Sequence, residues 1–344
     1  MAALPVPTDH AARYLARAAV TAPSPCNTQP WHFGYGSEGL CLFADPARCL
    51  PLADPGGREM LISCGAALLN IRLAMRHLGF LPRIEAFPDS ADPWHLATVG
   101  WGPYAAPTAD EETMFSALHR RHTHRGAFQP DPLSALLVGG LRWHARQEGT
   151  ELRTVGDPEA LRSLAALTRA SEATRRGHPA LAAELANWTP PHGSGRHDGV
   201  PAHAYPRDPD TTAFAGRDYA GRARMGYAAR ASSRLTLPTL GLVVLLCTRH
   251  DRPPDWLRTG QALQRVLLLA AAHRVTAAFH TQPLELPDLR HRVGRSVLTA
   301  GHPQMLLRLG YGDRARRTPR RPVGDVLSHE PPGPRYPAVP APSR

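Results

Sequence analysis

Lysine is absent from this chain of 344 residues, so all 40 basic residues are arginine, and they outnumber the 29 acidic residues. The resulting net charge of +11 is weak evidence for nucleic-acid binding, because the arginines are dispersed rather than clustered with aromatic residues. An arginine-rich nucleic-acid binder would show a steep dependence of binding on salt. It stands as the third of three hypotheses about function.

Cysteine is scarce as well: the chain has five, an odd number, without a CxxC pair. This argues against a disulfide framework and against a zinc knuckle. No apolar run reaches the length of a membrane span, and the first 22 residues lack the continuous apolar stretch of a signal peptide. We therefore expect a cytoplasmic protein with neither a membrane nor a nucleic acid as partner.

The common enzyme motifs are missing too. The sequence contains no Walker loop, no GxGxxG, no HExxH and no GxSxG. Cys64 has no base at a sensible spacing, so a small core residue is the better interpretation than a nucleophile. His119, His122 and His124 have no nearby cysteine or carboxylate, and we expect no metal site. These absences exclude little, but they leave no rival enzyme motif, and we name no catalytic side chain.

The chain reads as two α+β units in tandem, without convincing repetition between their sequences. We predict a first half over residues 1–103, a linker over 104–118, a second half over 119–328 and a disordered, proline-rich tail over 329–344. Within the second half, residues 187–234 lose periodicity and fill with Pro, Gly, His and Arg. Such a segment is usually disordered or a functional lid.

Periodicity predicts the elements of each half. In the first half we expect a helix over 10–21, a hairpin of 31–35 with 39–43, a helix over 60–75, and strands at 83–87 and 95–101. In the second half we expect helices over 111–121, 133–145 and 159–172, an apolar central strand over 240–247, a long helix over 256–273, and a strand over 304–311.

The most informative segment is the proline-framed loop of residues 22–30. Its neutral polar residues offer donors and acceptors without charge, which suits a planar polar heterocycle. A well-capped surface loop is the alternative. The residues that we single out are Pro23, Ser24, Pro25, Asn27 and Gln29.

Three further clusters could complete such a site. If residues 121–125 are extended, Arg121, Thr123 and Arg125 face the same way and form a cradle for phosphate and a polar ring edge; otherwise they form a solvated basic helix end. The segment of Pro283, Leu284 and Glu285 has an extended backbone that suits a flat ring, or it is merely a loop between helices. Arg320 and Arg321 belong to a basic motif that is nonspecific alone.

In order and content these clusters resemble the flavin-binding nitroreductase superfamily. The specific signal is the string APSPCNTQPWHF of residues 22–33; the supporting ones are GREMLISCG at 57–65, GYG at 310–312 and TPRRPV at 318–323. The chain is similar to the Acg-type branch, in which one chain carries two nitroreductase-like halves. The resemblance implies a nitroreductase-like α+β fold, a tandem pseudo-dimer with a lid-like insertion, that acts as a monomer.

The resemblance also implies the roles of residues toward FMN. Arg121 would meet the phosphate or ribityl end, with Thr123 in the same motif, and Arg125 would meet the N1 and C2-carbonyl edge. The loop of Pro23, Ser24, Pro25, Asn27 and Gln29 would reach across from the first half. Pro283, Leu284 and Glu285 would lie near N5 on the flavin's other side, and Arg320 and Arg321 would contact the phosphate.

The first half lacks the arginine motif at its start, so we expect one FMN per chain. The leading hypothesis is an oxidoreductase that passes electrons through FMN from NAD(P)H to a small electrophilic acceptor. The alternative is an FMN-sequestering or storage protein without turnover, since a lid over residues 187–234 would close the flavin face.

Overall fold

The computed structural model describes residues 8–204, 212–214, 216–217, 240–298, 300–313 and 317–329. Much of the predicted insertion and all of the predicted tail beyond residue 329 lie outside these ranges. The first half contains α1 (Asp9–Ala19), β1 (Trp31–Gly36), β2 (Gly39–Ala44), α2 (Arg58–His77), β3 (Phe80–Ala86) and β4 (His95–Tyr104). These elements match the helices and strands predicted there.

The rest of the chain holds more elements than predicted. They are α3 (Ala109–Ala117), α4 (Ala135–Gln147), β5 (Glu151–Val155), α5 (Pro158–Gly177), α6 (Pro179–Asn187), β6 (Leu242–Thr248), α7 (Pro253–Ala272), β7 (Thr276–Phe279), α8 (Pro287–Val297), β8 (His302–Gly310) and β9 (Leu327–Ser328). Within the stretch predicted as a linker, α3 opens with a capping box between Thr108 and Glu111 and packs on α2 and α7.

Two sheets carry the same topology. The first has the strand order β3-β4-β2-β1-β9 and the second the order β5-β6-β8-β7. Pairing of β1 through β4 is antiparallel throughout, and pairing of β5 through β8 repeats it strand for strand. One helix, α1 or α4, precedes the first strand of each set, and a 20-residue helix, α2 or α7, follows the second strand. The α+β class is therefore confirmed.

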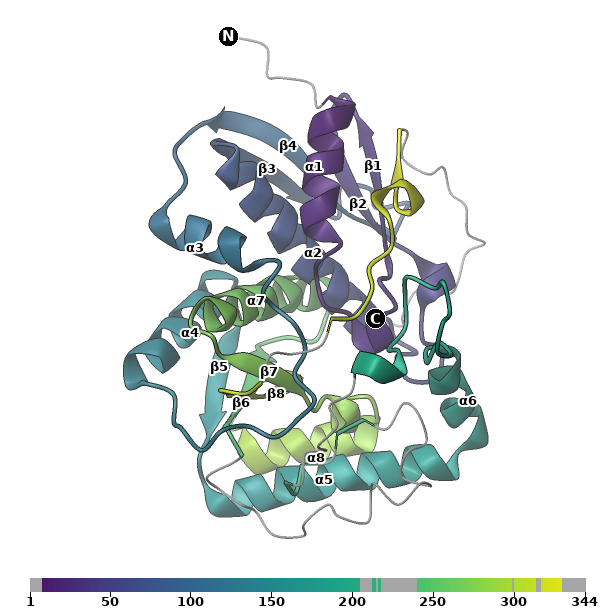
Figure 1. Cartoon of the computed structure of the whole chain (residues 1–344), viewed down its shortest axis with the longest axis vertical. Helices are drawn as coiled ribbons and strands as arrows, with labels where there is room; N and C mark the ends of the chain where they lie inside the picture. Colours follow the sequence, from purple (N-terminus) through teal and green to yellow (C-terminus); the bar gives the residue numbers. More distant parts are fainter. Residues whose placement is uncertain are drawn as a thin grey trace.

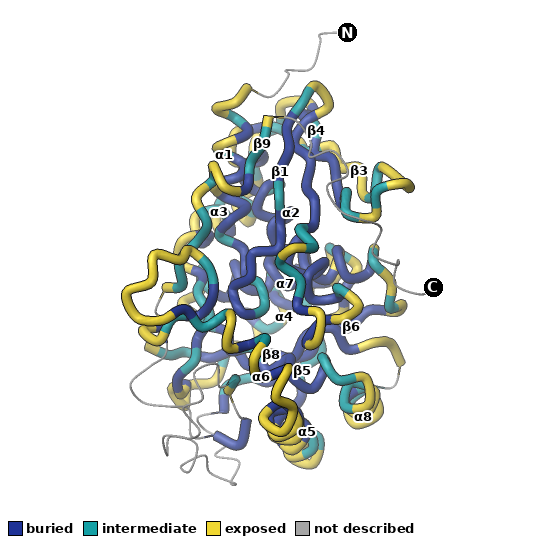
Figure 2. Tube along the Cα trace, turned by 90° about the vertical axis from the view of Figure 1, so that its right-hand side faces the viewer, coloured by how far each residue is buried: buried dark blue, intermediate teal, exposed yellow. Residues whose placement is uncertain are grey.

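The two long helices form the centre of the molecule (Figure 1). Helix α2 packs against the first sheet, α7 packs against the second, and the two helices pack against each other. One hydrophobic cluster runs through both of them, and the tube in Figure 2 is buried along this region while α5 and α8 expose a face. The core therefore joins the two halves.

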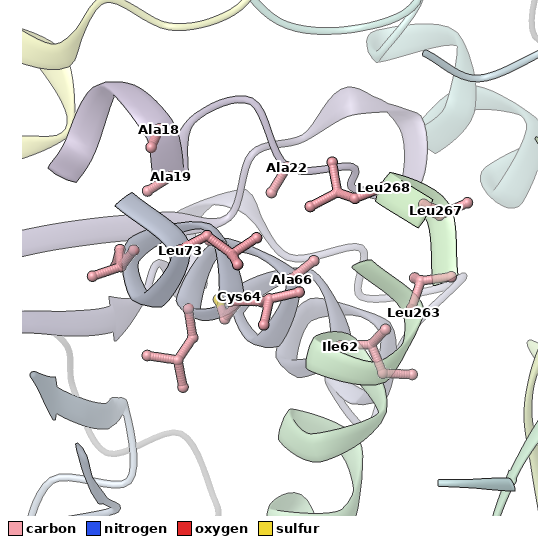
Figure 3. Packing of buried hydrophobic residues seen from close by; sticks show 14 of the residues in the cluster. Ala18, Ala19, Ala22, Ile62, Cys64, Ala66, Leu73, Leu263, Leu267 and Leu268 are labelled. Carbon is pink, nitrogen blue, oxygen red and sulfur yellow. The ribbon is translucent and has the colours of Figure 1, made fainter. Parts of the chain in front are cut away.

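Cys64 belongs to this core, between Ile62 and Ala66 of α2 (Figure 3). Its side chain is fully buried and its Sγ donates to the carbonyl oxygen of Pro30 at 3.2 Å. Burial raises the pKa of the thiol well above its usual value. The interpretation of Cys64 as a core residue is confirmed.

The last described strand returns to the first half. β9 pairs in parallel with β1, so that Phe33 lies opposite Leu327, and the segment that leads to it runs beside α1 and β1 in Figure 1. This crossing brings residues 317–329 next to the loop of residues 22–30. Two distant parts of the chain thus meet at one place.

Candidate functional site

The loop before β1 has an unusual backbone. Cys26, Asn27 and Gln29 have φ values of 51°, 55° and 51°, in the left-handed region, which costs free energy for residues other than glycine. The Ser24 Oγ accepts a hydrogen bond from the backbone N–H of Gln29 at 2.9 Å and closes the loop. Ser24 therefore stabilises the loop itself.

Both polar atoms of the Asn27 side-chain amide form hydrogen bonds with protein. Its Nδ2 donates to the carbonyl oxygens of Gly199 at 2.9 Å and Pro319 at 3.0 Å, while its Oδ1 accepts from Arg320 Nη1 at 2.9 Å. The side chain is 6% exposed. Asn27 therefore binds protein on every side that its amide can use.

Gln29 makes the equivalent set of bonds one step along the loop. Its Nε2 donates to the carbonyl oxygen of His197 at 2.8 Å, and its Oε1 accepts from the backbone N–H of Arg321 at 2.8 Å. It is completely buried. Both amides therefore join the loop to the segment around residues 197–199 and to residues 319–321.

Arg121, Arg125 and Arg320 come together beside this junction, and we call them the cationic corner. Burial, followed by the charges of Arg320 and Arg125, lowers the pKa of Arg121 to about 9. Burial and the charge of Arg125 lower the pKa of Arg320 to about 10. These shifts mean that Arg121 and Arg320 are held away from water and close to further positive charge.

Two guanidinium nitrogens in the cationic corner lack a partner. The Nε atoms of Arg121 and Arg320 are buried and make no hydrogen bond, although an unmet buried donor costs free energy. Among the described residues, no acidic side chain forms an ion pair with either arginine. An anionic group with acceptor oxygens is the complement that this arrangement lacks.

Residues 121–125 combine features of both predicted alternatives. The N–H of Arg121 donates to the Ala117 carbonyl at 3.0 Å and closes the helix end, whereas the backbone is strand-like at Thr123. Helix α3 ends at Ala117, Thr123 forms a parallel bridge with Ala277, and the N–H of His124 donates to the Ala277 carbonyl at 2.8 Å. Arg121 is only 4% exposed. The second sheet therefore fixes this segment through β7.

Arg321 has a different environment from Arg320. Its guanidinium reaches the carbonyl oxygens of Gln29 at 3.4 Å and Asp325 at 2.9 Å, and lies 3.9 Å from the Asp45 carboxylate. These contacts bind the residue 317–329 segment to the loop before β1. They leave Arg320 as the member of the pair that belongs to the cationic corner.

Pro283, Leu284 and Glu285 lie in another part of the site. Pro283 and Leu284 are buried in a short 3₁₀ helix, and Leu284 belongs to the second core cluster. The Glu285 carboxylate forms ion pairs with Arg175 and Arg217. No hydrogen bond or ion pair between described residues joins Glu285 to the cationic corner. The prediction of an extended backbone in this segment is wrong, because residues 282–284 form the 3₁₀ helix.

Glu285 belongs to a buried acidic cluster with Asp54 and Glu59, which the sequence reasoning missed. Asp54 accepts from the backbone N–H groups of Glu59 and Met60 and caps α2. Burial and the charge of Glu285 raise the pKa of Glu59 to about 8, despite Arg58 at 3.0 Å, and burial raises that of Asp54 to about 6. Charged residues inside an apolar helical pattern were the available signal.

A cleft of about 450 Å³ opens beside the junction, lined by residues 190–197, 201–203 and 317–319.

Over the described part of the chain, no group of His, Cys, Asp and Glu side chains is placed to hold a metal ion. None of the described helices is both long enough and apolar enough to cross a membrane.

Known proteins were compared with the whole chain. No protein-family model matches it. A protein of Mycobacterium tuberculosis named "Putative NAD(P)H nitroreductase" is 32% identical over 326 residues, which cover 93% of this chain and 92% of the relative. The "Putative NAD(P)H nitroreductase acg" of the same organism is 30% identical over 319 residues, covering 90% and 92%.

Solved structures show a more distant likeness. The FMN and NADPH-dependent nitroreductase NfnB of a Sphigopyxis species is 16% identical, with a TM-score of 0.41, and the match covers 63% of this chain and 99% of that one. The FMN-dependent NfnB of Mycobacterium smegmatis in complex with NADPH is 16% identical, with a TM-score of 0.38, over 64% and 99%. These TM-scores are too low to inform the site.

The sequence matches, which span nearly all of both chains, place this chain in the NAD(P)H nitroreductase family that includes Acg.

Proposed function

We propose that this protein is an FMN-binding oxidoreductase that takes electrons from NAD(P)H and passes them to a small electrophilic acceptor. The unmet Nε atoms of Arg121 and Arg320 are the observation that carries the proposal. A phosphate group supplies the negative charge that these two buried cations lack and acceptor oxygens for their two Nε atoms. Membership of the nitroreductase family identifies FMN as the phosphate-bearing group.

When bound, FMN supplies the redox chemistry, accepting and donating a hydride at its ring. Arg121 and Arg320 would hold its phosphate, with Thr123 in the same extended segment, and Arg125 would stabilise the negative charge of the reduced ring. The side-chain amides of Asn27 and Gln29 form hydrogen bonds with other parts of the protein. They would therefore shape the site rather than contact FMN.

We further propose that the two halves correspond to the two subunits of a dimeric nitroreductase, so that a cytoplasmic monomer suffices. The repeated topology of β1–β4 and β5–β8 supports this. In the second half, the Arg121 motif precedes α4. The residues of the first half contain no corresponding Arg-x-Thr-x-Arg motif. This asymmetry supports one FMN per chain.

A second candidate function is storage of FMN without turnover. The observation that favours it is the pair of hydrogen bonds from Asn27 to Gly199 and from Gln29 to His197. They hold part of the predicted lid segment beside the cationic corner. A segment held in this way would keep nicotinamide from the flavin.

One preparation separates these functions. The purified protein is expected to carry flavin, or to take up one FMN per chain, as measured by its absorbance spectrum and by titration. Rapid bleaching of that flavin by NADPH without oxygen supports the oxidoreductase. Reduction by dithionite but not by NADPH supports storage. A colourless protein that fails to take up FMN overturns both.

A further inference from the structure

The two amides of the loop before β1 join three segments that are far apart in the sequence. Asn27 reaches Gly199 across 172 positions and Pro319 across 292, and Gln29 reaches His197 across 168. Each amide uses its nitrogen for the segment around 197–199 and its oxygen for residues 320–321. His197 and Pro319, whose carbonyl oxygens accept these bonds, are among the residues that line the 450 Å³ cleft.

We propose that Asn27 and Gln29 are positioning residues that fasten residues 188–200 across the side of the cationic corner. The bonds that they make are directed and buried, and an amide alone offers both a donor and an acceptor for them. An amide whose nitrogen and oxygen are occupied by protein has little capacity left for a ligand. The pair therefore acts by holding this segment in place rather than by contacting a ligand directly.

A second set of contacts supports the same closure. Arg48 forms an ion pair with Asp198, donates to the carbonyl of Thr28 at 2.5 Å, and lies over the ring of Trp188 with its Cζ 5.3 Å from the centroid. The backbone N–H of Gly199 also donates to the Asn27 carbonyl at 3.3 Å. Residues 188–200 are thus held to the first half, although they lie in the second half of the sequence.

The left-handed backbone conformation of Asn27 allows a substitution that changes the hydrogen bonding of the side chain without straining the backbone. Asn and Asp are both tolerated at its φ of 55°, so Asn27→Asp changes the chemistry and spares the backbone. The new carboxylate still accepts from Arg320, but it loses the donor and repels the carbonyl oxygens of Gly199 and Pro319. Gln29→Glu likewise keeps the acceptor for Arg321 and loses the donor to His197.

The test is hydrogen–deuterium exchange of the flavin-free protein, followed by mass spectrometry. In Asn27→Asp, and separately in Gln29→Glu, exchange across the whole of residues 188–200 is expected to accelerate about tenfold or more, as lost buried hydrogen bonds imply. Helices α2 and α7 are expected to keep their protection. Gln147→Glu, at an exposed position at the end of α4, is the matched control and should change nothing.

Two results overturn the proposal. One is unchanged exchange at residues 188–200 in both variants. The other is loss of protection in α2 and α7 to the same degree, which would mean that the amides support the fold as a whole. Because no flavin is present, neither result depends on the proposed FMN site, whose failure would show in the titration described above.

Discussion

Gly65 of α2 and Gly260 of α7 lie against each other with no room for a side chain at either position. A Cβ on Gly65 would be 2.1 Å from the carbonyl oxygen of Leu257, and one on Gly260 would be 2.0 Å from that of Ile62. Each follows the first residue of its helix, Arg58 or Pro253, by the same number of positions. The contact is therefore made by equivalent residues of the two repeated units.

Adding one methyl group at this contact should separate the halves. Gly65→Ala or Gly260→Ala is expected to lower the free energy of unfolding by about 2–4 kcal/mol, because backbone rather than a flexible side chain must move. Gly139→Ala, on an exposed face of α4 with nothing near the new Cβ, should raise it by about 0.5–1 kcal/mol. Urea unfolding measures both, and equal stability of all three variants would contradict the close approach.

Removing a charge from the cationic corner should stabilise the empty protein and abolish cofactor binding. Arg121→Met is expected to raise the free energy of unfolding of the flavin-free protein by about 1–3 kcal/mol, since the buried charge has no acidic partner among the described residues. Its hydrogen bond to the Thr21 carbonyl at 3.1 Å is a smaller loss. Thermal unfolding and FMN titration give the two readouts.

Arg120→Met is the control for this prediction, because Arg120 is the exposed neighbour of Arg121. It should leave both the stability and the uptake of FMN unchanged. Retention of one FMN per chain by Arg121→Met would refute the assigned site. A loss of stability in that variant would show that Arg121 is compensated within the fold.

Glu59 should make stability depend on pH. Its pKa is raised from 4.5 to about 8 in the folded protein, so between these values the folded state binds more protons than the unfolded state. Its contribution is fully present below pH 4.5 and is lost as the pH rises through about 8. Glu59→Gln should therefore be more stable than the parent at pH 8 and show a flatter pH profile, measured by urea unfolding between pH 5 and 8.

Glu38→Gln, an exposed change in the turn between β1 and β2, should follow the parent profile. If Glu59→Gln also follows it, the acidic cluster is not protonated in this range. The opposite sign, a parent that gains stability from pH 5 to pH 8 through Glu59, would mean that Arg58 at 3.0 Å dominates over burial and Glu285.

A substitution at Glu285 distinguishes a role of this residue in stability from a role in binding FMN. Its carboxylate is 3% exposed and pairs with Arg175 and Arg217, so Glu285→Gln should lower the free energy of unfolding by about 2–4 kcal/mol. Because no described contact links it to the cationic corner, FMN affinity should change little. Weakened FMN binding with unchanged stability would instead favour the contact near N5 that the family resemblance implies.

The sequence predicted the parts of the fold that depend on local periodicity. The hairpin of β1 and β2 and the long helices α2 and α7 have strong apolar patterns and clear turn residues. The sequence did not predict strands β5 and β7. They have five and four residues, which are too few to show a clear alternation of apolar and polar positions. Pairing in the sheet, rather than local preference, stabilises such short strands.

The candidate site, too, was predicted from the sequence only in part. Residue type and spacing suggested Arg121 and Arg125 as a cradle for phosphate, and only the family resemblance added Arg320 to them. The commitment of Asn27 and Gln29 to protein partners was invisible, because it depends on neighbours 168 to 293 positions away. A side chain's chemistry can be inferred from sequence, whereas the use of that chemistry depends on which distant segment lies beside it.

The pairing of β9 with β1 has a consequence for how the protein folds during its synthesis. A chain emerging from the ribosome folds from its N-terminus, yet the loop before β1 obtains its partners from residues 317–329, the last of the described residues to be synthesised. Arg320 reaches Asn27 only then. A chain that has been synthesised only as far as residue 316 therefore has β1 to β4 of the first sheet but lacks β9 and the Arg320 side chain that bonds to Asn27.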